Sequence, residues 1–159
     1  MGYYHIAQIC ENGHLITGSI DTSPELSQNI CGAKTLTKCP NCNKNIKGNY
    51  EVEGVAFLGS TIHQAPSYCP ECGEPYPWTK NALDATKELL TMDSDLDEAE
   101  IQYLSENMNS LLSDTPKTKV VATKFKLALK KVSITTASAI KDILVDIASE
   151  AAKKIIFPQ

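Results

Sequence analysis

Hydrophobic and polar residues follow two different periods along the chain. In residues 1–78, short apolar and β-branched runs at positions 3–9, 14–17 and 52–58 have the pattern of β-strands. Glycines at positions 13, 18, 32, 48, 54 and 59 punctuate these runs. Ser23 before Pro24 has the pattern of a helix N-cap and predicts one brief helix. This part of the chain is therefore expected to be rich in strands and loops.

Residues 79–159 follow the period of α-helices instead. Thr79 is a candidate cap for a helix that runs to Leu90, and Ser94, with Asp97 three residues later, for a second helix. The segment TPKT at 115–118 predicts a break, and SITTAS at 133–138 predicts a kink or a loop. Three apolar stripes accompany these helices: Ile101, Leu104, Met108 and Leu111; Val121, Phe125, Ala128 and Val132; and Ile140, Ile143, Leu144, Ile147, Ala151 and Ile155.

The two patterns predict an α+β fold, with a small β-rich module in residues 1–78 and three or four C-terminal α-helices in residues 79–159. The 159 residues fit one domain, or a small domain with an appendage. The hydrophobic share of 42% and the charged share of 21% are those of a globular chain. The start MGYYHIAQICENG lacks the basic head and apolar run of a signal peptide, and no stretch approaches about 18 uncharged apolar residues, so a cytoplasmic protein is expected.

Charge divides the helical part into two segments. Residues 81–116 hold nine acidic residues against one lysine, a net charge of −8, whereas residues 117–159 hold nine lysines against three acidic residues, a net charge of +6. The expected helices are therefore acidic in residues 79–114 and basic and amphipathic in residues 117–157. All 15 basic residues are lysine, and the lack of the bidentate guanidinium disfavours sequence-specific DNA recognition. The two segments are expected to meet, within one chain or between two.

The candidate chemistry lies in the six cysteines. CPNC at 39–42 returns as CPEC at 69–72, and each Cys-x-x-Cys turn offers two thiolates that converge on one point. Since four thiolates complete the shell of a structural zinc ion, Cys39, Cys42, Cys69 and Cys72 are predicted to bind one Zn²⁺ in a zinc-ribbon module. Two alternatives are disulfides, which need an oxidising compartment, and a redox pair, which usually opens a helix after a strand.

A second group of candidate ligands precedes these turns. CENGH places Cys10 and His14 around Gly13, and Cys31 has the surroundings of the back half of another knuckle, whose front half is Gln28, a poor zinc ligand. Three arrangements follow: a three-ligand site completed by water or an outside ligand, a decayed site, or a cross-braced layout in which these residues share metals with the later knuckles. Buried free cysteines are also common, so this second zinc site is an open alternative.

The motifs CPNC and YCPECGEPYPWT, together with the ending DILVDIASEAAKKIIF, resemble a bacterial family of uncharacterised zinc-ribbon proteins, filed as a domain of unknown function. The likeness runs over residues 4–157, and CGEPYPWT is its most specific part. In that family the stretch matching residues 28–31 is itself a Cys-x-x-Cys, so Gln28 is a departure. The resemblance implies a cytoplasmic bacterial protein and supplies no activity.

The expected function is a non-enzymatic, zinc-binding adaptor that binds a protein partner. One alternative is a nucleic-acid-binding zinc ribbon, which the acidic middle and the lack of arginine disfavour while the lysine-rich tail favours it. Another is a zinc-dependent hydrolase with an open site at Cys10, His14 and Cys31 and Glu11 as its base. The chain shows no HExxH motif, phosphate-binding glycine loop or serine elbow.

Three features of the chain are candidate surfaces for a partner: the apolar stripes of the helices, the C-terminal residues and an aromatic pair. The long apolar stripes predict packing in a bundle, in a dimer or against a partner, and self-association through the C-terminal helices is expected. The terminal Lys153, Lys154 and apolar residues 155–157 resemble a membrane anchor, but the nearby acidic residues disfavour that role. Tyr76 and Trp78 are either an exposed aromatic platform or packed at the junction with the helices.

Overall fold

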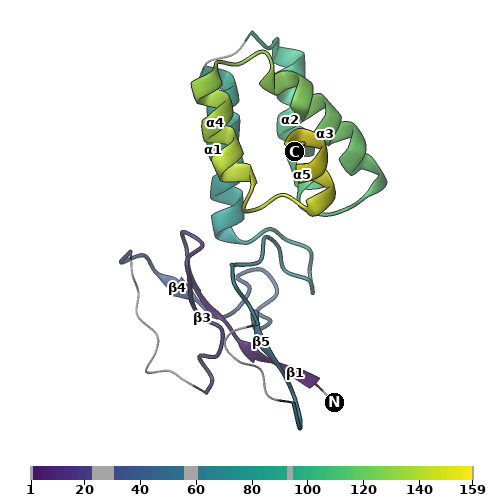
Figure 1. Ribbon diagram of the computed structural model, residues 1–159. Helices are drawn as coiled ribbons and strands as arrows, with labels where there is room; N and C mark the ends of the chain where they lie inside the picture. The colour runs from purple at the N-terminus through teal and green to yellow at the C-terminus, as the bar shows by residue number, and fades with distance from the viewer. Residues whose placement is uncertain (1, 23–30, 56–60, 93–94, 159) are drawn as a thin grey trace. The chain divides into compact units, whose positions relative to one another are not determined.

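The computed structural model describes residues 2–22, 31–55, 61–92 and 95–158. The chain divides into two compact units, Met1–Thr79 and Lys80–Gln159. Small antiparallel sheets in the first unit precede the helices, which confirms the predicted α+β class (Figure 1). Within the described residues the structure has five α-helices, where the sequence pattern indicated three or four. None of these helices combines the length and the apolar character needed to cross a membrane.

The first unit contains two small sheets. Strand β1 (Gly2–Ile6) pairs antiparallel with β5 (Lys47–Val52). Strand β2 (Gln8–Cys10) lies between β3 (Leu15–Thr17) and β4 (Thr35–Leu36), antiparallel to both. The single strand expected over residues 3–9 is thus divided at Ala7, because the N–H of Ala7 bonds to the carbonyl of Ile46 at 2.9 Å, outside either ladder. One apolar run therefore supplies a strand to each sheet.

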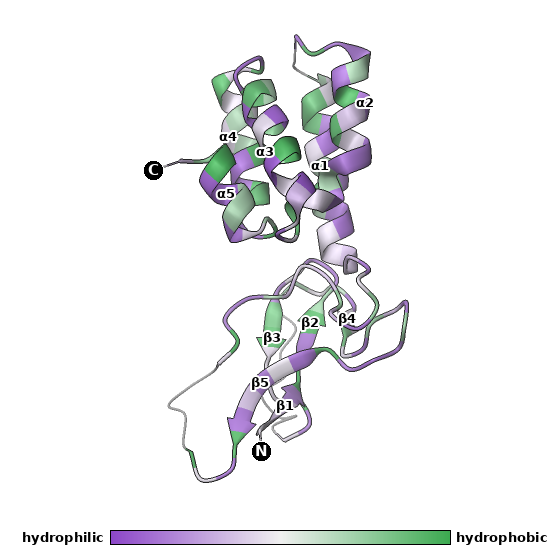
Figure 2. Cartoon of the chain, turned by 90° about the vertical axis from the view of Figure 1, so that its right-hand side faces the viewer, coloured by the Kyte–Doolittle hydropathy of each residue, from purple (hydrophilic) through white to green (hydrophobic). Residues whose placement is uncertain are grey.

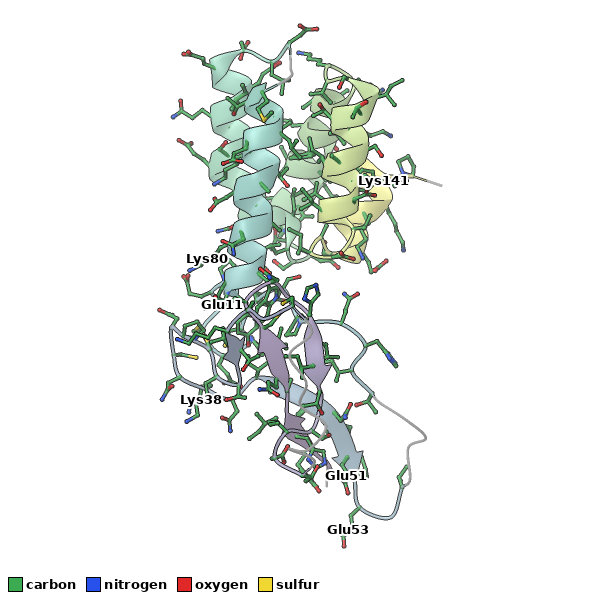
Figure 3. The ribbon with its side chains drawn as sticks, turned by 90° about the vertical axis from the view of Figure 1, so that its left-hand side faces the viewer. Glu11, Lys38, Glu51, Glu53, Lys80 and Lys141 are labelled. Carbon is green, nitrogen blue, oxygen red and sulfur yellow. The ribbon has the colours of Figure 1, made fainter. Side chains whose placement is uncertain are left out.

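Of the strand predicted over residues 52–58, the described residues 52–55 contain only the end of β5 and a turn. Strand β5 ends at Val52, and the chain turns through Glu53 and Gly54 before Val55 bridges back to Val52. Gly54 has a φ of +81°, which glycine adopts without strain. Figure 3 shows Glu51 on β5 and Glu53 at the outer end of this turn. Residues 56–60, and the brief helix expected at Ser23, lie outside the described residues.

His5 links three parts of the first unit. Its side chain is only 8% exposed, and its two ring nitrogens lie 3.0 Å from Asp21 Oδ2 and 2.5 Å from Glu51 Oε2. Asp21 also accepts the backbone N–H of Ile6 at 2.9 Å. The hydrogen bonds to Asp21 and Glu51 raise the pKa of His5 above its usual value. A protonated His5 thus ties β1 to β5 and to the turn at residues 19–22.

This cluster predicts how the stability of the unit depends on pH. Because the folded pKa of His5 is raised, its stabilising effect is complete below the unfolded pKa of about 6.5 and is lost as pH rises through the folded pKa. Urea unfolding should therefore show a midpoint that falls as pH rises above about 6.5. His5→Gln should flatten this dependence, while His63→Gln, at an exposed histidine, should keep it. An unchanged slope in His5→Gln would contradict the assignment.

The second unit contains most of the helical chain. Helix α1 spans Pro77–Met92 and α2 spans Glu98–Asn107, followed by the short 3₁₀ helix Met108–Leu111. Helices α3, α4 and α5 span Pro116–Leu129, Ile134–Leu144 and Glu150–Ile156. Helix α1 begins two residues before the predicted Thr79 cap, with Pro77 as its first residue, a position proline favours.

Capping explains where α2 and α3 begin. Asp97 accepts the N–H of Glu100 at 2.8 Å and Glu100 reaches back to the N–H of Asp97 at 3.3 Å, so Asp97 itself caps α2 in a capping box. Ser94, the predicted cap, lies outside the described residues. Thr115 and Thr118 form the same reciprocal arrangement at the start of α3, so the segment TPKT is a helix start as well as a break.

The prediction of a kink or loop at SITTAS is wrong, because Ser133 caps α4 and accepts the N–H of Thr136 at 3.2 Å. The β-branched residues that follow are tolerated in a capped first turn. The last apolar stripe is also divided, since α4 ends at Leu144 and Ser149 caps α5 while its own N–H bonds to the carbonyl of Leu111 at 2.8 Å. The cap residues, rather than the apolar period, decide these boundaries.

The apolar stripes form one core within a single chain. Hydrophobic positions recur among hydrophilic ones on all the helices in Figure 2. The buried cluster includes residues of every stripe, among them Leu104, Met108, Leu111, Val121, Phe125, Ile140 and Leu144. One chain therefore buries the stripes, and no second copy is needed to cover these residues. Self-association stays a prediction.

The acidic and basic segments meet inside this unit. Lys131 Nζ lies 2.8 Å from Glu100 Oε1, and Lys124 Nζ lies 3.9 Å from the centre of the Tyr103 ring. Both contacts join α3 or the residues that follow it to α2. Since exposed ion pairs contribute about 0 to 1 kcal/mol each, charge orients the two helices while the apolar core supplies most of the stability.

Candidate metal centres

The two Cys-Pro-x-Cys turns have the same backbone structure. The N–H of Asn43 bonds to the carbonyl of Cys39 and the N–H of Gly73 to that of Cys69, each at 2.8 Å. The N–H groups of the two leading cysteines bond to Lys44 and Glu74 at 2.8 and 2.9 Å. The residue after each second cysteine has a positive φ, 64° at Asn43 and 80° at Gly73. Glycine and asparagine are the residues that adopt this conformation most readily, which explains why both turns close.

These turns bring four sulfur atoms together. The Sγ atoms of Cys39, Cys42, Cys69 and Cys72 all lie within 4.8 Å of one another, with 3.7 Å between Cys39 and Cys72 and 3.7 Å between Cys42 and Cys69. A tetrahedral zinc ion with Zn–S bonds of about 2.3 Å separates its sulfurs by about 3.8 Å. Disulfide-bonded sulfurs lie about 2.05 Å apart, and these cysteines are free. The four cysteines can therefore coordinate one metal ion.

The electrostatics of this group favour a bound cation. Against burial, which raises it, hydrogen bonds from the backbone N–H groups of Cys72 and Glu71 lower the pKa of Cys69 to about 6. Although the backbone at Lys44 lowers it, burial and the three neighbouring thiols raise the pKa of Cys42 to about 12. Cys69 thus loses its proton readily, whereas a second deprotonation beside it, at Cys42, is unfavourable. A bound divalent cation makes the further deprotonation favourable, because it compensates the charge of the thiolates.

Cys10, His14 and Cys31 form a second group. Their ligand atoms lie within 4.8 Å of one another, with Cys10 Sγ 3.3 Å from His14 Nδ1 and 3.5 Å from Cys31 Sγ. Two N–H groups also reach the sulfurs, from the His14 backbone to Cys10 at 3.4 Å and from the Asn12 amide to Cys31 at 3.5 Å. Such donors stabilise thiolates and are usual around metal-bound sulfur. This group can therefore coordinate a metal as well.

The fold places this second group at the surface of the first unit. Cys10 is buried at the end of β2, whereas His14 and Cys31 are exposed. Pairing of Cys10 with Thr35 across β2 and β4 brings the region of Cys31 to the turn that holds Cys10 and His14. The two groups of ligands are separate, so the cross-braced layout is not the one observed. Gln28 lies outside the described residues.

The family model for the description "Uncharacterized protein conserved in bacteria (DUF2321)" matches residues 3–156. The chain belongs to this family. The description names neither zinc nor an activity, so the metal-binding character of the chain rests on its cysteines. No curated protein and no solved structure matches the chain significantly.

In this member of the family, Tyr76 and Trp78 connect the two groups of ligands. Their rings stack at 4.8 Å and 25°, and both are buried, so the alternative of an exposed aromatic platform is wrong. Burial and the adjacent thiolate of Cys69 raise the pKa of Tyr76. A Cβ atom added to Gly13 would lie 3.1 Å from the Cβ of Trp78. The aromatic pair therefore reaches from the four-cysteine group to the loop that carries Cys10 and His14.

Trp78 packs inside the first unit. It belongs to a small core with Ala7, Ile9 and Ile46, which also includes Cys39 and Cys69, and its indole N–H bonds to the carbonyl of Pro66 at 2.8 Å. No spacing in the sequence indicates this contact or the His5 cluster, because the first depends on core packing and the second on the pairing of β1 with β5. A core this small indicates that the cysteines are central to the stability of the unit.

The second unit contains a cavity of about 500 Å³. It lies between α2 and α3, with an apolar lining from Leu96, Ala99, Tyr103, Leu104, Leu127 and Ala128. Asp97, Glu100, Lys124 and Lys131 add charges of both signs. Leu127 is 53% exposed, so part of this apolar lining faces solvent.

Proposed function

We propose that the protein is a zinc-binding interaction module without catalytic activity. The spacing of the four sulfurs at 3.7 Å supports zinc, since it fits the tetrahedral shell of that ion. Four thiolates leave no coordination position for water or substrate, so this zinc is structural. Its role is to hold a unit whose apolar core is too small to fold firmly alone.

The surface proposed to bind the partner is the cavity between α2 and α3, and the proposed partner is an amphipathic helix of another protein. A groove between two helices with an apolar floor accepts the apolar face of such a helix. Glu100 and Lys131 at the cavity pair with each other, which leaves Asp97 and Lys124 as its other charges, so a helix with a basic residue for Asp97 and an acidic residue for Lys124 fits best.

Nucleic acid is the less favoured partner. The chain has no arginine, and its formal net charge is −4. Nucleic-acid binding depends on neutralising phosphates with positive charge, and Lys131, one of the lysines at the cavity, is already paired with Glu100. The apolar groove, in contrast, offers the kind of surface that protein helices occupy.

Substitution in the groove tests this proposal. Leu127→Lys should weaken capture of the partner by about tenfold or more, because it places a charge on an apolar contact. Ile134→Lys, at an apolar residue of α4 that is 90% exposed, is the matched control and should capture the partner like the wild type. The measurement compares proteins retained by the three tagged, zinc-loaded chains in a bacterium of the family, with and without nuclease. Equal retention by both variants, or a complex lost on nuclease treatment, would contradict a protein partner at this groove.

A further inference from the structure

We infer that Cys10, His14 and Cys31 hold a second zinc ion whose fourth coordination position is filled by a thiolate from outside the chain. The inference shares with the proposed function only the zinc-dependent fold of the first unit. It concerns a different set of ligands with a different role. The second zinc keeps one coordination position for an exchangeable ligand, whereas the four-cysteine zinc has none.

The ligand set supports zinc at this position. Sulfur and nitrogen bound to one tetrahedral zinc lie about 3.6 Å apart and two sulfurs about 3.8 Å apart. The observed separations of 3.3 Å for Cys10 and His14 and 3.5 Å for the two sulfurs are close to these values. The N–H groups of Asn12 and His14 that reach the sulfurs supply outer contacts of the kind expected of zinc-bound thiolates.

The chain has no cysteine left to complete this site. The two groups use all six cysteines of the sequence and one of its three histidines. Of the other two, His5 is held by Asp21 and Glu51. A fourth sulfur ligand must therefore come from another molecule. Because His14 and Cys31 are exposed, such a molecule has access to the metal.

Charge and softness favour a thiolate over water. The thiolates of Cys10 and Cys31 already balance the two positive charges of the ion, so the metal acidifies a bound water less than a site of neutral histidines does. A soft thiolate binds such a zinc more strongly than water and completes a Cys₃His set, which is common in proteins. Binding is a ligand exchange without redox change: the incoming thiol loses its proton to solvent, its sulfur bonds to zinc, and water leaves.

Trp78 offers a local reporter of this site. It is the single tryptophan of the chain and packs on Gly13, between the ligands Cys10 and His14. A Co²⁺ ion at the second centre should therefore quench its emission. Co²⁺ also reports its ligands, because each bound thiolate adds sulfur-to-metal charge-transfer absorption.

The test loads the full chain with Co²⁺ and then adds N-acetylcysteine. The wild type is expected to bind about two ions per chain and to gain charge-transfer absorption that saturates at about one thiol per chain. His14→Ala should bind about one ion and show no response to the thiol, whereas His63→Ala should behave as the wild type. N-acetylserine is the control without sulfur. The affinity for N-acetylcysteine distinguishes the two sources of the outside thiolate. Saturation at micromolar thiol indicates a free small thiol. Saturation at millimolar thiol indicates a cysteine of a partner protein, because the other contacts of that protein strengthen the binding of its cysteine.

Two results would overturn the inference: one ion per chain in the wild type with no loss in His14→Ala, or two ions and no spectral response to the thiol. The second result would instead leave water at the fourth position, as a hydrolase requires. An error in the four-cysteine assignment would be recognised separately, because Cys42→Ser would then bind as many ions as the wild type. That outcome leaves the comparison between His14→Ala and His63→Ala intact.

Discussion

Cys69→Ser is expected to release the zinc ion of the four-cysteine centre and to unfold the first unit, while the helices of the second unit remain folded. Binding of zinc by four thiolates contributes on the order of 10 kcal/mol, which is comparable to the whole stability of a small domain. Cys69 is buried in the core formed by Ala7, Ile9, Ile46, Tyr76 and Trp78. Loss of the metal there removes the principal constraint on this core.

Three measurements check this expectation: zinc content, helical circular dichroism, and limited proteolysis read by mass. The variant should keep most of its helical signal and become sensitive to protease within residues 1–79. Glu71→Gln is the matched control, because Glu71 lies exposed within the same turn and pairs with Lys47 only at 3.8 Å. It should retain its zinc and its resistance. A Cys69→Ser protein with full metal content and an intact first unit would show that the four-cysteine assignment is wrong.

Phe125→Ala is expected to have the opposite effect. Phe125 is fully buried on α3 within the core of the second unit, and removing its ring should cost about 3 to 5 kcal/mol because it leaves a cavity. The helices should then unfold at lower temperature or denaturant concentration. Zinc content should not change, since the metal ligands belong to a separate core.

Leu127→Ala is the matched control for this variant. It removes a large apolar side chain from the same helix, but Leu127 is half exposed, so the cost should stay within about 0.5 kcal/mol. Urea unfolding followed by helical circular dichroism, together with a zinc assay on each protein, measures both effects. If Phe125→Ala also lost its zinc, the two units would not be independent in stability.

Local chemistry in the sequence predicts much of this protein. The repeated Cys-Pro-x-Cys motif predicts both the turns and the grouping of their four sulfurs, because proline and the left-handed residue after each turn act over a few positions. The buried apolar stripes are signals of the same short range, whereas the caps were not all predicted: Asp97 rather than Ser94 caps α2, and TPKT, predicted as a break, holds the capping box of α3. The sequence missed the start of α4, where the cap at Ser133 outweighs the low helix propensity of Thr135 and Thr136.

Long-range pairing decides the rest. The sequence names Cys10, His14 and Cys31 as candidates but leaves their arrangement open, and the pairing of β2 with β4 places them together, apart from the other four ligands. The pairing of β1 with β5 likewise brings Glu51 to His5. Trp78 stacks on Tyr76 and also packs against Gly13, which is distant in the sequence. By itself the sequence determines the α+β class, the knuckles and the helical apolar faces, since these depend on neighbouring residues. Only the tertiary structure decides which distant ligands share a site, because that depends on strand register and core packing.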